Sequence, residues 1–505
     1  MTLETDINKF MDENYVELKL SNVRENKVIH MANLGTHHFF NHEMAIIDTP
    51  VVQRLKYISQ LGQVYNVFPT ARHSRFEHTL GVAISVNKMW NSLSENGSLS
   101  FLRDVRNKAK ILSDLRICAI LHDIGHCPFS HVSEIVLRDF TSIEDETHKL
   151  GGKPHEIFGH YMIKSDVFKA FFENLYKHYK IYVNPEEISN YLLGKVDNPV
   201  ENQYIADLIN GQIDADKLDY IIRDSDFSGV QLALGIDRLL LSLCTDKIPT
   251  SDGRSKHRML IVNEKGIMPL EQLVLAKIML YSSIYHHQKV RAIDHMIISI
   301  LRMIYEDKTE INGIPVQSPI DLLRLDELDL LKLKSDNSKI TSLCKQLKNR
   351  QTFKRCLVIS PRTLEPDKYQ NQFDSFLSYA ESPKMIRELN KELAERIGKE
   401  CTEFDVAIDL PETPRLGETH QKIIKMGNDL VPLTDIFPYS GWLQSYMSNK
   451  WKGHIFASDD YRKKASVEGK AMLEEKFEFK FNENAITDAK ILPLYKSQRT
   501  IPDFC

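Results

Sequence analysis

The chain has 505 residues, of which 42% are hydrophobic and 27% are charged, and its formal net charge is −4 at pH 7. This balance is ordinary for a globular protein with room for two or three domains, or for one large body with extensions. It excludes a general nucleic-acid-binding protein, because such proteins carry an excess of Lys and Arg.

Neither a membrane span nor a secretory signal is expected. No apolar run has the length of a bilayer-spanning helix, and the N-terminus MTLETDINKF is polar and acidic. The seven cysteines are scattered, odd in number and without a CxxC pair. They predict neither a disulfide framework nor a thiolate zinc site. We therefore expect a soluble cytoplasmic protein without a membrane partner.

The first half of the chain is predicted to be mostly helical, because its apolar residues recur every three to four positions. Residues 139–154 are an exception: they are polar and contain Gly151 and Gly152, so we expect a flexible segment over a site. The other expected elements are a loosely held lead over 1–26, a short strand within 27–35, and helices over 37–62, 75–90, 106–125, 154–163, 166–180, 185–194 and 203–229.

The second half adds small β elements to further helices. Residues 258–270 are expected to form a hairpin, and 353–360 and 403–411 to form strands. The leucine-rich segment 318–347 is interpreted as an amphipathic helix that faces the core, in preference to an oligomerisation stripe. A long helix from about 269 to 306 and an ordered extension beyond 436 complete the prediction. The fold class is mainly α with small β additions.

The segment RICAILHDIGHCPFSH, residues 116–131, places His122 and Asp123 side by side at the end of an apolar helical run. Burying both side chains is costly unless something satisfies them, and a divalent metal would do so. A lone His–Asp pair is weak evidence, since a hydrogen-bonded His next to a solvated Asp is the commoner arrangement. Other segments must therefore supply further ligands.

Three other apolar helical segments also carry His or Asp: His78 in RFEHTLG, His155 in KPHEIF, and Asp214 with Asp216 in GQIDADKLDY. Each is more often structural than functional when taken alone. Together with the central segment they offer imidazoles and carboxylates suited to Mn, Fe, Zn or Ni, with positions left open for water and substrate. Bundled helices are a common frame for such a metal core.

One helix face in the last of these segments matches a nucleotide. Asp216, Tyr220 and Asp224 are spaced by four residues, with Lys217 beside them. The face therefore offers a metal ligand, an aromatic ring, a hydroxyl acceptor and a cation in line, as phosphate, sugar and base require. The alternative is a solvated charged face, which is less favoured because neighbouring Leu and Ile residues supply a separate apolar face.

The motifs RFEHTLG, HDIGHCPFSH, PHE and DADKLDYIIRD, in this order and at these distances, resemble the HD-domain phosphohydrolases. The segment IIDTPVVQRLKYISQLGQVYNVFP narrows the resemblance to the deoxynucleoside triphosphate (dNTP) triphosphohydrolases with a sterile-alpha-motif domain and their bacterial dGTPase-like relatives. The resemblance covers roughly residues 27–300. It implies an N-terminal lead over 1–26 without a sterile-alpha-motif domain, an HD-domain helical core over 27–306, a lobe over 307–435 that contributes to an oligomeric or regulatory site, and an α+β extension over 436–505.

The resemblance implies the metal ligands His78, His122, Asp123 and Asp216, and the catalytic residues His126, His131, His155 and Glu134. The family's reaction is attack of water on the α-phosphorus, with release of deoxynucleoside and intact inorganic triphosphate. A histidine with a near-neutral pKa is suited to protonate the departing 5′-oxygen, and we assign this role to His131. Glu134 stands where the relative has Asp, so the orienting carboxylate is one methylene longer.

The same matching assigns substrate contacts, with Mg²⁺ expected on the nucleotide phosphates. Tyr220 should lie under the ribose and crowd a 2′-hydroxyl, which favours deoxynucleotides. Lys277 replaces an arginine at the terminal phosphate and loses its bidentate geometry. The remaining assignments are Arg75 and Lys217 to the phosphates, Gln60, Leu61 and Asp224 to the sugar, and Tyr285 near the base.

A second set of residues resembles the family's activator site for a guanine nucleotide at a subunit interface. Asp48 suits guanine, because a carboxylate accepts hydrogen bonds from both N1–H and N2–H. The set comprises Lys27, Val28, Asp48, Gln53 and Lys56, the partner-subunit phosphate clamp Arg350 and Lys354, and Val67, Arg238 and Lys265 for a neighbouring second nucleotide. Asn263 and Pro269 depart from the pattern of that second site. The alternative is a solvated charged surface.

We therefore predict a metal-dependent dNTP triphosphohydrolase that forms a homo-oligomer, with a tetramer as the first expectation. Activation by GTP, dGTP or another dNTP is expected, and the role is dNTP pool control or anti-phage defence. One alternative is another HD reaction, such as hydrolysis of a nucleoside monophosphate or an alarmone. The other is a non-catalytic nucleotide sensor.

Overall fold

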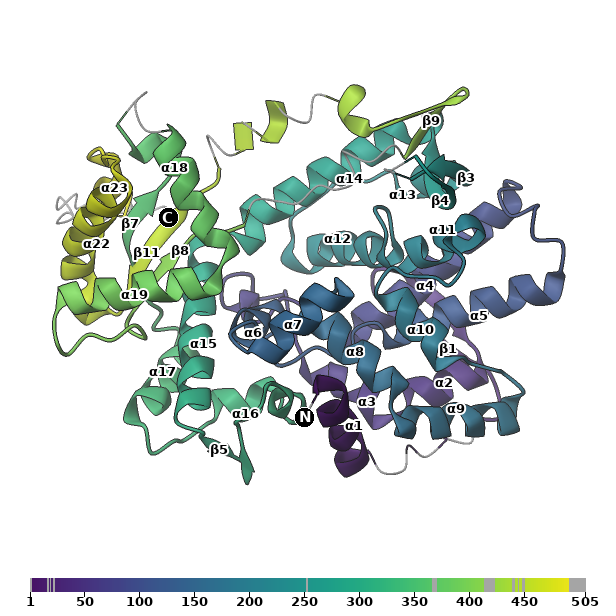
Figure 1. Cartoon of the computed structure of the whole chain (residues 1–505), viewed down its shortest axis with the longest axis horizontal. Helices are drawn as coiled ribbons and strands as arrows, with labels where there is room; N and C mark the ends of the chain where they lie inside the picture. The colour runs from purple at the N-terminus through teal and green to yellow at the C-terminus, as the bar shows by residue number, and fades with distance from the viewer. Residues whose placement is uncertain are drawn as a thin grey trace, which may run out of the picture. The chain divides into compact units, whose positions relative to one another are not determined.

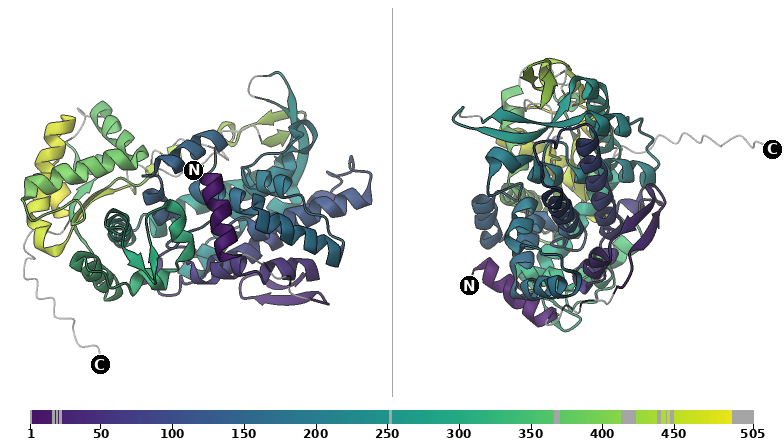
Figure 2. Two further views of the ribbon diagram at one scale, coloured as in Figure 1. Left: turned by 60° about the horizontal axis from the view of Figure 1, so that its bottom comes forward. Right: turned by 90° about the vertical axis from the view of Figure 1, so that its right-hand side faces the viewer.

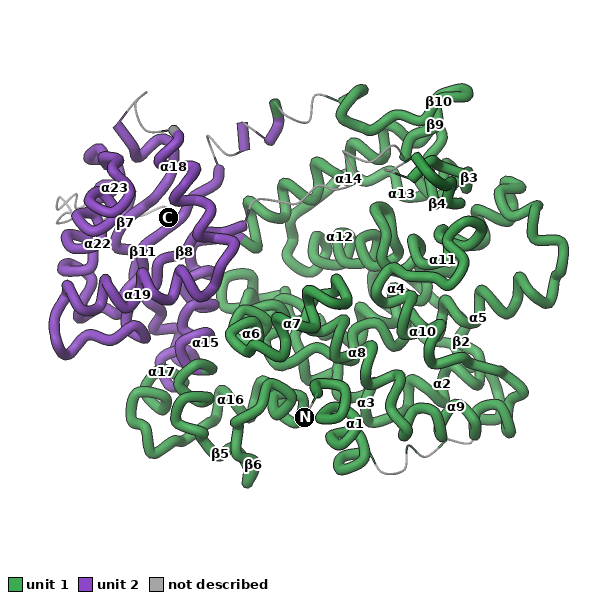
Figure 3. The backbone as a smooth tube through the Cα atoms, viewed as in Figure 1, with its two compact units in different colours: residues 1–285, 301–344, 414–441 green, residues 286–300, 345–413, 442–505 purple. Residues whose placement is uncertain are grey.

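The computed structural model describes residues 2–15, 18, 20, 23–250, 253–365, 370–412, 423–437, 441–443, 445–446 and 450–489. The chain divides into two compact units that alternate along the sequence (Figure 3). Unit 1 comprises residues 1–285, 301–344 and 414–441, and unit 2 comprises residues 286–300, 345–413 and 442–505. All the predicted metal ligands and catalytic residues belong to unit 1.

Unit 1 is built mainly of helices and short helical turns (Figure 1). Up to residue 285 these are α1 (Leu3–Asn14), α2 (Asn41–Ile47), α3 (Pro50–Gln53), η1 (Arg54–Tyr57), η2 (Val64–Asn66), α4 (Arg75–Glu95), α5 (Val105–Leu121), α6 (His131–Leu137), α7 (Thr141–Leu150), α8 (Pro154–Lys164), α9 (Asp166–Tyr179), α10 (Pro185–Leu192), α11 (Pro199–Asn210), α12 (Ala215–Ser228), α13 (Ile236–Ser242), η3 (Glu264–Gly266), α14 (Ile267–Leu280) and η4 (Tyr281–Tyr285). Its later helical elements are η5 (Pro319–Arg324), α16 (Glu327–Leu331) and η8 (Leu433–Asp435).

Two further helices, α15 (Gln288–Glu306) and α17 (Ser338–Lys348), contain residues of both units. The remaining helical elements belong to unit 2. They are η6 (Pro361–Thr363), α18 (Gln370–Leu377), η7 (Ser378–Glu381), α19 (Pro383–Ile397), η9 (Asp459–Tyr461), α22 (Arg462–Phe477) and α23 (Asn484–Thr487).

The strands form small separate sheets. In unit 1, β1 (Lys27–Met31) pairs with β2 (Gly35–Phe39), β5 (Glu310–Ile311) pairs with β6 (Ile314–Pro315), and a four-stranded sheet has the order β10 (Asp429–Val431), β9 (Ile424–Met426), β4 (Lys256–Asn263), β3 (Leu243–Pro249). Strands β3 and β4 form an antiparallel hairpin that projects from the helices of unit 1 (Figure 2). In unit 2, β11 (Gly453–Ala457) lies between β7 (Lys354–Ile359) and β8 (Val406–Asp409), antiparallel to both.

The core of unit 1 forms where α4 packs against α5 and α12 (Figure 1). α4 begins after Ser74, whose backbone N–H donates to the carboxylate of Glu77, as in a capping box. Gly81 permits the close approach of α12, because a Cβ at this position would lie 1.9 Å from Asp219 Oδ1. This packing brings the last turn of α5, the first turn of α12 and the first turn of α4 to one place.

The observed architecture confirms the predicted fold class of a mainly α protein with small β additions. The predicted strands within 353–360 and 403–411 are β7 and β8. None of the six described cysteines forms a disulfide bond with another described cysteine. Among the described residues one stretch, Glu264–Tyr285, has the length and apolar composition of a membrane span, but half of its most apolar window is buried inside the protein, as in a core helix.

The predicted flexible segment over 139–154 is wrong, because most of it is helix α7. Ile143 anchors the helix in the core, and the Tyr161 hydroxyl donates to Glu146 Oε2 at 2.5 Å. Gly151, with a φ of 76°, ends the helix in the left-handed conformation. The glycine that suggested a loop is therefore the cap of a helix.

Other boundaries also differ from the prediction. Residues 37–39 belong to β2, since they pair with β1 instead of entering a helix. The hairpin expected over 258–270 joins β4 to the earlier strand β3, and α14 begins at Ile267. The long helix expected over 269–306 is interrupted by the π-helical turn η4, and the leucine-rich segment 318–347 divides into η5, α16 and α17.

Candidate metal and catalytic site

The four predicted metal ligands come from three elements and lie together. His78 is on the first turn of α4, His122 and Asp123 follow α5, and Asp216 is on the first turn of α12. One ligand atom from each of His78, His122 and Asp123 lies within 4.8 Å of the others. Asp216 Oδ1 is 2.9 Å from His78 Nε2, so the fourth ligand belongs to the same cluster.

Hydrogen bonds to the far side of each ring orient the two histidines. His122 Nδ1 donates to the carbonyl of Ala119 at 2.7 Å, and His78 Nδ1 is 2.8 Å from Asp219 Oδ2. Arg223 in turn holds Asp219 through its Nε at 2.8 Å. In both rings the hydrogen bond uses Nδ1, so Nε2 points toward the cluster. Metal-binding histidines need this orientation.

The electrostatics of the cluster fit a divalent cation. His122 Nε2 is buried without a hydrogen-bond partner. Burial opposes ionisation of Asp123, yet Arg75, His122 and His126 hold its pKa well below the usual value. Burial lowers the pKa of His78, but the hydrogen bonds and negative charges of Asp216 and Asp219 outweigh this effect and raise the pKa to about 10. Ionised carboxylates therefore lie beside the His122 nitrogen, which makes no hydrogen bond among the described residues. Positive charge stabilises such an arrangement, and a metal ion would supply it.

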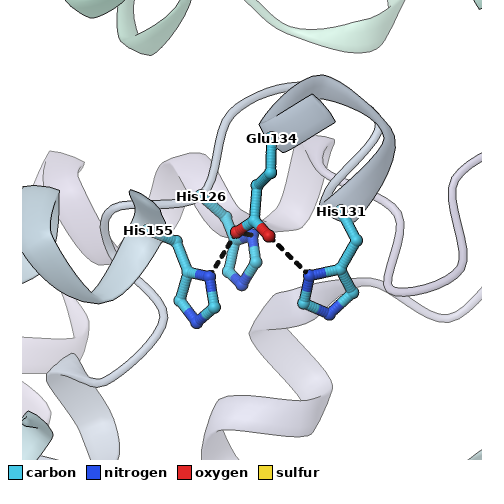
Figure 4. A group of neighbouring side chains, drawn as sticks. All are labelled: His126, His131, Glu134 and His155. Carbon is cyan, nitrogen blue, oxygen red and sulfur yellow. Dashed lines mark hydrogen bonds and ion pairs between the residues drawn. The ribbon is translucent and has the colours of Figure 1, made fainter. Parts of the chain in front are cut away.

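A second cluster combines His126, His131 and Glu134, which follow Asp123 in the chain, with His155 of α8, and is organised by one carboxylate (Figure 4). His155 Nδ1 makes a short contact with Glu134 Oε1, and His131 Nδ1 is 3.1 Å from Glu134 Oε2. His126 stacks on His155 with ring centroids 3.8 Å apart. The Nε2 atoms of the three rings point away from Glu134 (Figure 4). The carboxylate fixes the orientation of His131 and His155 through Nδ1 and leaves their Nε2 atoms for other partners.

The members of this second cluster have different protonation preferences. Burial, with Arg75 and His155 nearby, holds the pKa of His126 well below its usual value, so this ring is neutral. Burial would raise the pKa of Glu134, but His155 and His131 hold it well below the usual value. His131 is the accessible member, with 60% of its side chain exposed. One atom from each of the four residues lies within 4.8 Å of the others, which is also the spacing of a metal site, but Glu134 already occupies two of the ring nitrogens.

Arg75 and the backbone connect the two clusters. Arg75 Nη1 donates to Asp123 Oδ2 at 2.6 Å and its Nε donates to Ser130 Oγ at 2.7 Å. His126 Nε2 is 3.3 Å from Asp123 Oδ1. Gly125 allows α8 to pack here, because a Cβ at Gly125 would lie 2.1 Å from the His155 carbonyl oxygen.

The predicted sugar-binding residues form a third group. Asp224 accepts a hydrogen bond at 2.5 Å from the Tyr285 hydroxyl through Oδ2, and its Oδ1 is 2.9 Å from His73 Nε2. Lys217 Nζ, expected at the phosphates, contacts Asp214 Oδ2 at 2.5 Å and the Gly211 carbonyl at 2.7 Å. The other predicted substrate residues belong to unit 1 as well: Gln60 and Leu61 after η1, Tyr220 on α12, and Lys277 on α14.

The predicted activator residues are divided between the two units. Lys27, Val28, Asp48, Gln53, Lys56, Val67, Arg238 and Lys265 belong to unit 1, and Arg350 and Lys354 belong to unit 2. Arg238 Nε donates to the Lys265 carbonyl at 3.2 Å. Arg54, between Gln53 and Lys56, donates to the carbonyl oxygens of Ile124 at 3.2 Å and His126 at 2.5 Å. The segment that carries the expected guanine contacts is therefore bonded directly to the HD segment.

Comparison with known families identifies the fold of this site. Residues 75–219 match the HD domain family, and residues 252–481 match the family described as HD associated region. The first match runs from Arg75 to Asp219 and so contains all four predicted metal ligands and the Glu134 cluster. The chain contains an HD domain followed by an HD associated region.

Several relatives share extended similarity with this HD-domain protein. An uncharacterized protein of Methanocaldococcus jannaschii is 27% identical over 417 residues, which are 82% of this chain and 75% of that protein. Deoxynucleoside triphosphate triphosphohydrolase SAMHD1 of Bos taurus is 30% identical over 292 residues, which are 54% of this chain and 46% of the bovine protein. The match to its human counterpart is 32% identical and covers 37% of this chain and 31% of that protein. The chain thus matches about half or less of the named triphosphohydrolases.

A solved structure shares the fold of the HD-domain protein. The crystal structure of a hypothetical protein from Aquifex aeolicus aligns with a TM-score of 0.60 at 22% sequence identity. The alignment covers 88% of this chain and 100% of that chain.

Sequence reasoning missed three residues around the site of the HD-domain protein. Asp219 orients His78, His73 contacts Asp224, and Ser130 joins Arg75 to the loop before His131. Asp219 lies within the quoted motif DADKLDY, three residues after Asp216. On a helix this spacing places the two carboxylates on one face, which was a usable signal.

Proposed function

We propose that the chain is a divalent-metal-dependent dNTP triphosphohydrolase that releases deoxynucleoside and inorganic triphosphate. One observation carries the proposal: the segment 122–134 contributes residues to both the candidate metal cluster and the Glu134 cluster, with Asp123 Oδ1 only 3.3 Å from His126 Nε2. A candidate metal cluster therefore adjoins three imidazoles whose Nε2 atoms point away from Glu134. Phosphoryl transfer requires this combination of a charge-stabilising centre and proton-transfer groups.

The metal ligands in this proposal are His78, His122, Asp123 and Asp216. A divalent cation held by them would lower the pKa of a water molecule and withdraw charge from phosphoryl oxygens. Arg75 adds a fixed positive charge at the same place, because its Nη1 is 2.6 Å from Asp123 and its Nη2 is buried without a hydrogen-bond partner. A phosphate oxygen of the substrate suits that remaining donor.

His131 acts as the general acid toward the departing 5′-oxygen in this proposal. Its side chain is the most exposed of the Glu134 cluster. Partial loss of solvent lowers the pKa of His131, while the carboxylate at 3.1 Å from Nδ1 acts in the opposite direction and aims Nε2 outward. His126 is buried and neutral, which suits it to accept a hydrogen bond from water or to position phosphate. His155, stacked on His126 and bonded to Glu134, completes this frame.

The sugar is assigned to the group around Asp224. A carboxylate accepts more hydrogen bonds than the two contacts made by His73 and Tyr285, so Asp224 retains capacity for a 3′-hydroxyl. Tyr220 lies one helical turn before Asp224 on α12 and is expected to exclude a 2′-hydroxyl. Lys217 and Lys277 are proposed to contact the phosphates, and for Lys217 this requires exchange of its contact with Asp214 for the substrate.

Activation by a guanine nucleotide or a dNTP, with assembly into a homo-oligomer, forms part of the proposal. Its support is the link from the segment of Gln53 and Lys56 through Arg54 to the carbonyls of Ile124 and His126. A nucleotide that orders this segment would act on the backbone that carries both clusters. Arg350 and Lys354 are proposed to reach the nucleotide from a partner subunit.

A hydrolysis panel tests the proposal. Purified protein loaded with Mn²⁺ is incubated with each of the four dNTPs and with GTP, alone and in combination, and the products are separated by ion-exchange chromatography. We expect deoxynucleoside and triphosphate in equal amounts, with faster turnover when a guanine nucleotide is added. Orthophosphate, pyrophosphate or nucleoside monophosphate as the first product would replace the proposal with another HD reaction, and binding without turnover would favour a nucleotide sensor.

A further inference from the structure

A buried carboxylate outside the HD-domain match reaches two loops of the site. Glu327, the first residue of α16, is 6% exposed and lies more than 100 residues after the end of the HD-domain match at 219. Its Oε1 accepts the backbone N–H of Ser59 at 2.9 Å and of Phe129 at 3.2 Å, and its Oε2 accepts the Ser59 hydroxyl at 2.8 Å. One side chain therefore holds two loops that are 70 positions apart in sequence.

Both loops lead directly into the site. Ser59 precedes Gln60 and Leu61, which are assigned to the sugar, and Phe129 lies two residues before His131. Phe129 and Ser130 have φ values of 64° and 54°, a left-handed conformation that non-glycine residues adopt only when their surroundings enforce it. The bond from the Phe129 N–H to Glu327 is one such constraint.

A chain of hydrogen bonds continues from these loops to the metal cluster. Ser130 Oγ donates to the Ser59 carbonyl at 2.6 Å and accepts the Arg75 Nε–H at 2.7 Å. Arg75 Nη1 then donates to the metal ligand Asp123 at 2.6 Å. The path Glu327–Ser59–Ser130–Arg75–Asp123 is unbroken.

We propose that Glu327 is a positioning residue for the hydrolytic reaction, which rests on the proposed function: it fixes the Ser59 and Phe129 loops and thereby the placement of Arg75 and His131. It touches neither the substrate groups nor the metal ligands. Misplacement of catalytic groups by about 1 Å is able to cost roughly 100-fold in rate.

Two substitutions test the length of the Glu327 side chain and its charge separately. In Glu327→Gln, the amide oxygen takes the place of Oε1 and keeps both backbone hydrogen bonds, while the negative charge is lost. Burial raises the pKa of Glu327 to about 7, so a neutral side chain is already well tolerated here. In Glu327→Asp, the charge remains but the carboxylate is one methylene too short to span Ser59 and Phe129. Asp326→Ala is the matched control, because Asp326 caps the same helix by accepting from Leu328 and Asp329 and contacts neither loop.

Hydrogen–deuterium exchange tests the contact without reference to activity. Peptides that contain Ser59 and Phe129 should exchange at least about tenfold faster in Glu327→Asp than in the wild type, because each loses the acceptor that protects it. Glu327→Gln and Asp326→Ala should leave these peptides unchanged. Unchanged exchange in Glu327→Asp, or equal acceleration in Asp326→Ala, would overturn the proposal.

Steady-state kinetics on the same metal-loaded variants test the consequence. Glu327→Asp should lower kcat by about 10- to 100-fold with bound metal at the wild-type stoichiometry, and Glu327→Gln should stay within about threefold of the wild type. A kcat of Glu327→Asp equal to the wild type would overturn the positioning role. A wild-type protein that releases no triphosphate would refute the proposed function instead, and the exchange experiment would still decide whether Glu327 holds the two loops.

Discussion

At the scale of single residues, the site depends on which nitrogen of each histidine is already engaged. His78 and His122 are held through Nδ1 by Asp219 and by the Ala119 carbonyl, and His131 and His155 are held through Nδ1 by Glu134. In both groups a hydrogen bond at Nδ1 turns Nε2 toward the site. In the first group Nε2 lies close to carboxylates, 2.9 Å from Asp216 for His78 and 3.3 Å from Asp123 for His122, whereas both rings of the second group pack against His126.

Removal of one metal ligand should abolish metal binding while the fold persists. We expect His122→Ala to lose bound metal and to reduce turnover by roughly 100-fold or more, since direct ligands matter at least as much as their supporting partners. The measurement is metal content by mass spectrometry together with triphosphate release. His160→Ala is the control, because His160 is a buried histidine whose one hydrogen bond within the described part of the chain is to the Ser189 carbonyl. Full metal content and turnover in His122→Ala would contradict the ligand assignment.

Loss of the general acid should affect turnover more than binding. His131→Ala is expected to lower kcat by about 10²- to 10⁴-fold, with KM changed much less, because the acid acts on the leaving group in the transition state. The comparison is made on metal-loaded protein with the preferred dNTP. An equal loss in kcat and in substrate affinity would assign His131 to binding.

The grouping of the four predicted metal ligands was predictable because each lies in a short motif whose residue types are unusual for an apolar helix. His78, His122, Asp123 and Asp216 lie together in the structure, as that prediction requires. Glu327 was not predictable, since its sequence neighbourhood is an ordinary leucine-rich stretch and its partners Ser59 and Phe129 are about 200 residues away or more. A hydrogen bond of such long range has no local pattern.

At the scale of elements, predictions failed where a residue type has more than one structural use. Gly151 was taken as part of a loop but ends α7. The apolar residues of 269–306 predicted one helix, yet α14 and α15 are separate because the chain forms a π-helical turn over Tyr281–Tyr285. Hydrophobic periodicity reports that a segment is helical more reliably than it reports where the helix is interrupted.

Helix α15 carries a buried ionic group whose energetics depend on pH. Arg291 Nη2 and His295 Nε2 contact Asp409 of β8 at 2.6 and 2.9 Å. Asp294 lies 3.7 Å from Arg291, and burial raises its pKa from 3.8 to about 7. The folded state therefore binds this proton more tightly than the unfolded state, so the contribution to stability is complete below pH 4 and is lost as the pH rises toward 7.

Asp294→Asn should remove this loss of stability at higher pH, because the asparagine side chain does not ionise. We expect the variant to be more stable than the wild type by about 2–4 kcal/mol at pH 8, with the difference shrinking toward pH 4. Urea unfolding across this pH range measures it, with the exposed Asp460→Asn as the control in the same unit. A difference that does not change with pH would contradict the assignment of a raised pKa to Asp294.

At the scale of the whole molecule, the chain passes repeatedly between two compact units, and the proposed catalytic groups all belong to the first. The residues that match an activator site are split between the units, with Arg350 and Lys354 in the second. No motif in the sequence indicated this alternation, because it is set by contacts between distant segments.

The guanine contact provides a test of regulation. Asp48→Asn should raise the GTP concentration required for half-maximal activation by at least about tenfold, since a hydrogen bond to a charged group contributes about 1.5–3 kcal/mol. Metal content should be unchanged. Asp48→Asn is compared with Glu173→Gln, an exposed substitution on α9, by activation curves and by sedimentation of the oligomer with and without GTP. Curves that coincide with the wild type would remove Asp48 from the activator site.

The central claim is hydrolysis at the α-phosphorus, and reaction in ¹⁸O-labelled water tests it most directly. Metal-loaded protein is incubated with its preferred dNTP in labelled water, and each product is analysed by mass spectrometry. The account predicts one ¹⁸O atom in the released triphosphate and none in the deoxynucleoside, because water attacks phosphorus and the 5′-oxygen leaves. Label in the 5′-hydroxyl of the deoxynucleoside, or labelled orthophosphate or nucleoside monophosphate in place of triphosphate, would contradict it.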